Sequence, residues 1–205
     1  MEPVRGADPV RPVVVFTAND RPHYMRRVLA SWERVRGIED ALLIFQCEPH
    51  LPTVELVSAV TFAEIVVNVN GRQMGVEANP YLAMRAGFAT GADFVIQGEE
   101  DTTVTADLLE YMAWARDEYE ADKNVAAICT LQNRGLGPRD EVDRRAWFSS
   151  STWGTWRDRW DDIRDDWPAG PRDGGSWDWY MTYRCVRDRR KVTIEPCTTR
   201  APHIG

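Results

Sequence analysis

An apolar segment that runs directly into three consecutive carboxylates constrains this chain most. The segment, 94–98, reads Phe-Val-Ile-Gln-Gly, and Glu99, Glu100 and Asp101 follow it. The apolar part is typical of a buried β-strand, whereas adjacent acids without partners cost several kcal/mol each when they are buried. We therefore expect the acids at the end of the strand. Oxygen-only clusters suit hard divalent ions such as Mg²⁺ and Mn²⁺, and a solvated turn is the alternative interpretation.

Strand and helix patterns alternate through the first half of the chain. Asp20 is a candidate cap for the first helix, with Pro22 in its first turn. The predicted strands cover 13–17, 41–47, 64–70 and 93–97, and the predicted helices cover 20–36, 53–60 and 79–91. This alternation predicts an α/β fold, with a mostly parallel sheet flanked by helices on both faces.

The second half of the chain lacks this regular alternation. Its predicted elements are a helix at 105–119, a strand at 125–131, a polar loop at 132–145 and a helix at 154–165. Seven of the nine tryptophans lie between Trp147 and Trp179. Core packing is the first explanation for them, and a platform for the C–H faces of sugar rings is the second. A glycine-rich segment at 170–175 is expected to form a mobile loop.

Composition narrows the class of protein. A length of 205 residues suits one domain, and a net charge of −7 argues against long nucleic acids as the main partner. No apolar run approaches the ~18 residues of a membrane span, and 1–12 has no apolar signal-peptide core. The four cysteines have no paired spacing, so small buried thiols in a reducing cytoplasm are expected.

The ends of the predicted strands are expected to converge. In open sheets of this kind, ligands bind at the carboxyl ends of the strands. The segments that follow the four strands should therefore share one crevice; they are 17–21, 46–48, 68–71 and 99–101.

With this order established, four segments together resemble nucleotide-sugar glycosyltransferases of the GT-A fold, between the large family-2 group and the N-acetylglucosaminyltransferase I type. They are 13–22, 94–111, 177–181 (Trp-Asp-Trp-Tyr-Met) and 195–205 (Glu-Pro-Cys-Thr-Thr-Arg-Ala-Pro-His-Ile-Gly). The resemblance implies one GT-A domain over 1–205 with a Rossmann-like mixed sheet. Its nucleotide-binding half would be 1–101, and its acceptor and catalytic half 102–205.

The resemblance also implies site residues. Asp101 matches the carboxylate that binds Mn²⁺ or Mg²⁺ directly, and His203 resembles a C-terminal histidine that serves as a further metal ligand or phosphate contact. Glu99 and Glu100 match positions at the ribose or at the waters of the metal, although the family more often has aspartate in the middle. The remaining donor-binding positions are Thr17, Asn19 and Arg21 at the base and phosphates, Glu48 near the uracil edge, and Trp177.

The segment 177–181 is similar to the one that supplies the catalytic base in the family, and the resemblance implies this role for Asp178. An acceptor hydroxyl is a poor nucleophile until a base removes its proton, and the alternative for Asp178 is a helix N-cap. The implied activity is a metal-dependent, inverting transfer of sugar from a nucleotide-diphosphate sugar, with a UDP-sugar favoured. The acceptor stays open among a protein, a glycan, a small molecule and a modified DNA base.

Two other functions share some of these sequence features. A GT-A-like nucleotidyltransferase also holds Mg²⁺ on strand-end acids, but it would carry a glycine-rich loop where 17–22 has no glycine. A non-catalytic carbohydrate-binding module would need only the tryptophans and no nucleotide crevice.

Overall fold

The apolar runs of the first half form four neighbouring parallel strands. Strand β1 (Val13–Ala18) lies between β2 (Leu42–Cys47) and β4 (Phe94–Glu99), and β3 (Glu64–Val69) pairs with the outer side of β2. All three pairings are parallel, as the alternation of strands and helices predicts. The carboxyl ends of β1, β2 and β4 consequently point to the same edge of the sheet.

The second half extends this sheet with mixed pairing. The computed structural model describes residues 11–132, 137–138, 140–168 and 176–205, in which the strand order is β3-β2-β1-β4-β7-β5-β8-β6. β7 pairs antiparallel with both β4 and β5, β8 runs parallel to β5, and β6 is an antiparallel edge strand. The bounds are β5 (Val125–Cys129), β6 (Val142–Arg145), β7 (Trp153–Trp156) and β8 (Val192–Pro196).

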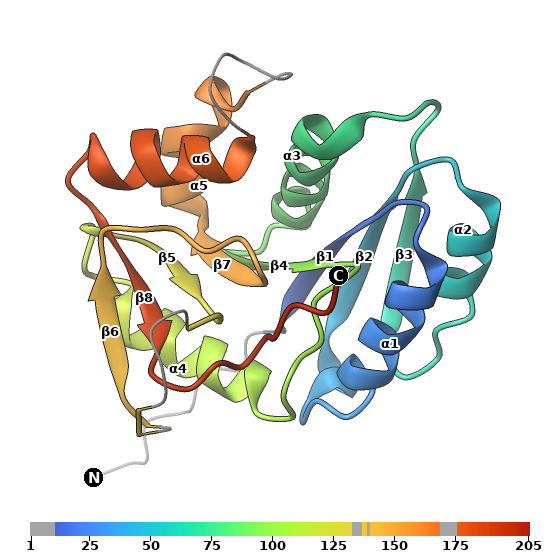
Figure 1. Cartoon of the computed structure of the whole chain (residues 1–205), viewed down its shortest axis with the longest axis horizontal. Helices are drawn as coiled ribbons and strands as arrows, with labels where there is room; N and C mark the ends of the chain where they lie inside the picture. The colour runs from blue at the N-terminus through green and yellow to red at the C-terminus, as the bar shows by residue number, and fades with distance from the viewer. Residues whose placement is uncertain (1–10, 133–136, 139, 169–175) are drawn as a thin grey trace, which may run out of the picture.

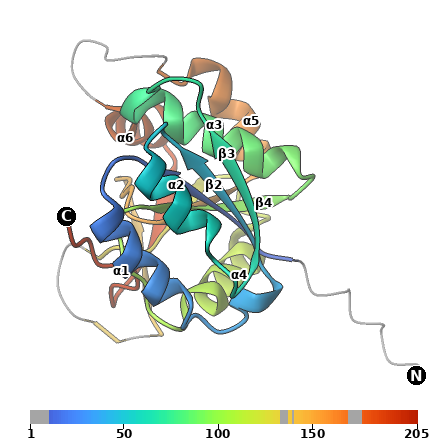
Figure 2. The ribbon, with the colours of Figure 1, turned by 90° about the vertical axis from the view of Figure 1, so that its right-hand side faces the viewer.

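Helices cover both faces of the sheet (Figures 1 and 2). One layer comprises α1 (Pro22–Trp32), α2 (Leu51–Ser58) and α4 (Leu108–Tyr119). The other comprises α3 (Gly75–Ala89), α5 (Arg157–Ile163) and α6 (Trp177–Tyr180), which continues as a π-helix over Met181–Arg187. Single 3-10 turns occupy Ile38–Asp40 and Arg164–Asp166.

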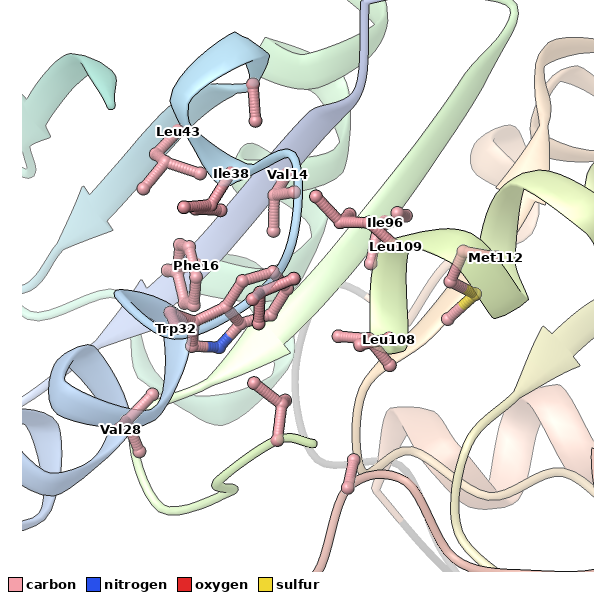
Figure 3. Close-up of a cluster of buried hydrophobic side chains, with 14 of the residues drawn as sticks. Val14, Phe16, Val28, Trp32, Ile38, Leu43, Ile96, Leu108, Leu109 and Met112 are labelled. Carbon is pink, nitrogen blue, oxygen red and sulfur yellow. The ribbon is translucent and has the colours of Figure 1, made fainter. Parts of the chain in front are cut away.

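Alternation along the central strand supplies both cores. Val14 and Phe16 point into the layer of α1, α2 and α4, whereas Val13 and Val15 point into the layer of α3, α5 and α6. In the first core, Trp32 of α1 meets Phe16 edge to face, with the two ring centroids 5.1 Å apart. Figure 3 shows the two side chains lying together. Because β1 is covered on both faces, its carboxyl end is the part that can meet a ligand.

Several helix boundaries differ from the sequence prediction, most clearly those of α1 and α3. Asp20 does not cap α1; the N-cap is Arg21, with no side-chain capping bond, and the helix ends at Trp32 rather than near 36. Helix α3 begins at Gly75, four residues before 79, and contains Pro80 within it. At this earlier start, the amides of Met74 and Gly75 donate hydrogen bonds to the carboxylate of Glu48, which follows β2.

The tryptophan-rich segment also differs from the prediction. Residues 153–156 form strand β7 rather than the start of a helix, and Trp153 and Trp156 are buried on opposite faces of the sheet. At Gly154, an added Cβ would lie 2.5 Å from the Phe94 ring, so the close pairing of β7 with β4 requires glycine. Five of the seven clustered tryptophans are buried, which confirms core packing for most of them.

The predicted mobile loop at 170–175 lies outside the described residues. Within the residues that are described, no helix combines the length and the apolar character needed to cross a bilayer.

Cysteine reactivity tests this packing. Burial raises the pKa of Cys47 and of Cys129 to about 12 and that of Cys185 to about 11, so these thiols stay protonated and covered at pH 8. Cys197 is only half-buried. We expect one rapidly reacting thiol per native chain in a titration with Ellman's reagent, and four after denaturation. Cys197→Ser should remove the rapid phase, and two or more rapid thiols in the native protein would contradict the packing.

Candidate functional site

The carboxyl ends of β1, β2 and β4 open into a cavity of about 470 Å³. Its walls also come from the start of α3, the start of α6 and the C-terminal segment. Nine of the ten residues predicted for the site line this cavity, namely Thr17, Asn19, Arg21, Glu48, Glu99, Glu100, Asp101, Trp177 and His203. Asp178 is the exception and lines a neighbouring groove.

Arg21 joins two of the three strand-end acids. Its Nε donates to Glu100 Oε1 at 2.6 Å, and its Nη1 lies 2.7 Å from Asp101 Oδ2. The backbone amide of Asn19 donates to the other Glu100 oxygen at 2.7 Å. Burial alone would lower the pKa of the Arg21 guanidinium, but Glu100 and then Asp101 raise it. The loop after β1 is therefore fixed to the end of β4 by charge-assisted hydrogen bonds.

Glu99 is the last residue of β4 and lies opposite Thr17 of β1 in the strand register. Burial raises the pKa of Glu99 to about 8, and the charges of Asp101, Asp178 and Glu100 add to this effect while Arg21 opposes it. At neutral pH the carboxyl is therefore mostly protonated in the ligand-free protein. A protonated carboxyl donates a hydrogen bond, which suits a hydroxyl or phosphate acceptor in the cavity.

The C-terminal segment closes the site next to Asp101. His203 forms a β-bridge with Thr102, and the amide of Ile204 donates to the Asp101 carbonyl at 2.8 Å. Figure 1 shows this segment crossing from β8 to the end of β4. His203 Nε2 consequently lies 3.4 Å from Asp101 Oδ1.

Asp101 and His203 supply a donor set that fits a divalent ion. The carboxylate is nearly buried and the imidazole is about half exposed, so the pair is open on the side of the cavity. Arg21 already places a positive charge 2.7 Å from Asp101 Oδ2, so a metal ion at Asp101 would have to share or replace this contact. No group of three or more histidine, cysteine or acidic side chains with metal-binding geometry occurs in the described residues. Two protein ligands are enough for an ion that also binds phosphates and waters.

Glu48 has a second role that the sequence did not indicate. Its carboxylate accepts hydrogen bonds from the amides of Met74 and Gly75, the latter at 2.7 Å, and from Asn70 Nδ2 at 3.0 Å. These bonds fix the start of α3 to the end of β2. The predicted contact of Glu48 with a nucleotide base stays a prediction, and it would have to share a carboxylate that already holds this loop.

The start of α6 lies beside the start of α3. Burial raises the pKa of the Glu77 carboxyl and the nearby amide of Trp177 opposes that rise, while the Glu77 carbonyl accepts a hydrogen bond from Trp167 Nε1 at 2.9 Å. Trp177 faces the 470 Å³ cavity. Asp178 is the second residue of α6, and the N-cap of this helix is Ser176. The Asp178 carboxylate accepts hydrogen bonds from the Ser176 hydroxyl and from the Trp179 amide.

Sequence reasoning missed several residues of the cavity wall, all at the start of α3. They are Gln73, Gly75, Val76, Asn79 and Pro80. Asn79, predicted as the start of a helix, donates to the Gln46 carbonyl at 3.2 Å and accepts from Asn70. The sequence carries no local signal for this role, because Asn79 lies ten residues after the end of β3.

The anchoring role of Glu48 is testable by chemical denaturation. Glu48→Ala leaves the amides of Met74 and Gly75 without their acceptor, and we expect the free energy of unfolding to fall by about 1–3 kcal/mol. Glu64→Ala is the matched control, because Glu64 pairs with Arg11 while its side chain is 63% exposed. That change should cost less than about 1 kcal/mol. Equal effects for the two variants would contradict the anchor.

Comparisons with known proteins address the fold. No protein-family model matches the sequence, and no curated protein matches it. The crystal structure of S. aureus TarS 1–349 matches with a TM-score of 0.67 and 13% identity, over 94% of this chain and 60% of that chain. The structure of TarS 1–349 in complex with UDP-GlcNAc matches with a TM-score of 0.64 and 12% identity, over 95% of this chain and 58% of that chain.

The mannosyltransferase PcManGT from Pyrobaculum calidifontis, in complex with GDP-Man and Mn²⁺, matches with a TM-score of 0.62 and 13% identity, over 92% of this chain and 55% of that chain. The chain thus spans about three fifths or less of the structures it matches. At sequence identities of 12–13%, the similarity to these structures is evidence for the fold alone. The chain has the GT-A-like α/β fold found in nucleotide-sugar glycosyltransferases.

Proposed function

We propose that this protein is a metal-dependent, inverting glycosyltransferase that moves a sugar from a nucleotide-diphosphate sugar to an acceptor hydroxyl. One observation carries the proposal. Three parallel strand ends and the C-terminal segment bring Arg21, Glu99, Glu100, Asp101 and His203 to one cavity. That cavity has the size and the position at which open α/β sheets bind nucleotides.

The donor is proposed to be a UDP-sugar. TarS has been crystallised with UDP and with UDP-GlcNAc, whereas PcManGT was crystallised with GDP-Man and Mn²⁺. Arg21 is positioned to contact the diphosphate, because its side chain is partly exposed at the cavity while it bonds Glu100 and Asp101. Thr17, Asn19 and the start of α3 are proposed to surround the nucleoside.

Asp101 and His203 are proposed to hold the divalent ion. A divalent ion there would offset the negative charge that develops on the diphosphate as the glycosidic bond breaks. The imidazole nitrogen favours Mn²⁺ over Mg²⁺, whose preferred ligands are oxygen atoms. Glu100 then keeps the loop after β1 in place through the amide of Asn19.

Asp178 is proposed as the general base. Its carboxylate is partly buried and close enough to Glu99 for their charges to interact, although it lines the neighbouring groove. Attack by a hydroxyl on the face of the sugar opposite the diphosphate requires the base to lie away from the phosphates. The position of Asp178 in the groove beside the cavity, rather than in the cavity itself, supports this role.

The other two functions have less support. A carbohydrate-binding module needs no cavity lined by strand-end acids, and the buried tryptophans leave only a small exposed aromatic surface. A nucleotidyltransferase would need a glycine-rich loop after β1, where this chain has Asn19, Asp20 and Arg21. The free cysteines support the proposal that the protein works in the reducing cytoplasm.

Asp101→Ala tests the metal site. We expect the variant to fold, because Asp101 lies at the end of a strand, but to lose Mn²⁺-dependent binding of UDP in isothermal titration calorimetry. Turnover should fall by 10²-fold or more, on the order of the loss seen when one electrostatic stabiliser is removed. Asp93→Asn is the control, since Asp93 precedes the same strand at its other end and its side chain is 88% exposed. Wild-type transfer that persists in EDTA would refute the metal dependence.

Asp178→Asn tests the base. The change keeps size and hydrogen bonding while removing proton acceptance, so turnover at saturating donor should fall by ~10²–10⁴-fold. Binding of the donor should stay within a few-fold of wild type. If Asp178 only stabilises the start of α6, turnover should hardly change, because asparagine stabilises helix starts about as well as aspartate.

A further inference from the structure

A second hollow lies on the other side of the start of α6. It is a groove of about 240 Å³ formed by the segment before β7 and by α6 with its π-helical continuation. Its described walls carry Trp147 and Trp179, the serines at 149, 150 and 151, and Asp178. The proposed donor cavity does not use this groove.

The two hollows meet at one pair of consecutive residues. Trp177 lines the donor cavity, and Asp178 lines the groove. Because the two residues are consecutive, Asp178 lies at the border between the groove and the donor cavity. A molecule in the groove would therefore meet Asp178 beside the donor cavity.

The mouth of the groove is an aromatic surface. The side chain of Trp179 is 43% exposed, and its ring stacks on Tyr183 at 5.2 Å with an interplanar angle of 5°. Trp147 meets Trp179 edge to face at 5.9 Å, and the Arg187 guanidinium lies over both Trp147 and Tyr183. These contacts hold Trp179 in place while part of its surface stays open to solvent.

The chemistry of the walls selects one class of ligand. An exposed indole offers a flat apolar surface for the C–H face of a sugar ring, and serine hydroxyls both donate and accept hydrogen bonds. Among the described wall residues only Asp178 is charged, so an anionic ligand would meet a carboxylate inside the groove. The Arg187 guanidinium lies over Trp147 and Tyr183 near the mouth, but one cation does not supply the row of positive charges that the phosphates of a nucleic acid need.

We propose that this groove is the acceptor site and that it binds a neutral sugar ring stacked on Trp179. This inference rests on the proposed glycosyltransferase function and adds the class of acceptor. In the transfer, the acceptor hydroxyl gives its proton to Asp178, and its oxygen forms a bond to the anomeric carbon of the donor sugar. The bond from that carbon to the diphosphate breaks, and the nucleoside diphosphate leaves with the electron pair.

A binding panel tests the acceptor class in the absence of donor. The probes are neutral tetrasaccharides of glucose, mannose and N-acetylglucosamine, an anionic galacturonate oligomer, and a single-stranded DNA 12-mer. Binding is followed by saturation-transfer NMR and by tryptophan fluorescence. We expect at least one neutral oligosaccharide to bind the wild-type protein, and Trp179→Ala to weaken that binding by about tenfold.

Trp114→Ala is the matched control, because Trp114 is also exposed, at 45%, but lies on α4 and outside the groove. It should leave binding of the sugar within twofold of wild type. The proposal is overturned if no neutral sugar binds, if only the galacturonate or the DNA binds, or if both tryptophan variants have equal effects. UDP binding with Mn²⁺, measured in parallel, reports separately on the proposed function, since Trp179→Ala should leave it unchanged.

Discussion

Three carboxylates at the end of one buried strand determine which charged groups must lie around the cavity. Glu99, Glu100 and Asp101 repel one another in a partly enclosed place, so their charges must be met by protons or cations. Arg21 bridges two of them, and the raised pKa of Glu99 keeps the third protonated at neutral pH. In the ligand-free protein the three acids are thus accommodated by one proton and by the Arg21 guanidinium.

Two buried carboxylates lie next to backbone amides at the starts of the helices that line the donor cavity. Glu48, just after β2, fixes the amides at the start of α3. Glu77, in the first turn of α3, lies near the amide of Trp177 at the start of α6, and this amide opposes the rise in the pKa of the buried Glu77 carboxyl. Helix α6 carries Trp177 toward the donor cavity and Asp178 toward the groove.

Local patterns predicted the first half of the fold well, because each of its strands is an apolar run that ends in polar residues. They failed at β7, where two tryptophans buried on opposite faces resemble an amphipathic helix. The acids and Arg21 were predictable from their place after strands. The role of Glu77 was not, because its contact with Trp177 joins segments a hundred residues apart. Only the folded chain shows that Asp178 lies between two hollows.

The most direct test of the proposed site is the position of manganese in crystals grown with UDP and Mn²⁺, located by anomalous scattering at the manganese edge. The account predicts one strong peak within bonding distance of an Asp101 carboxylate oxygen and next to the diphosphate, with Arg21 no longer joined to both Glu100 and Asp101. UDP bound in the cavity with no manganese peak, or with the peak away from Asp101, would contradict it.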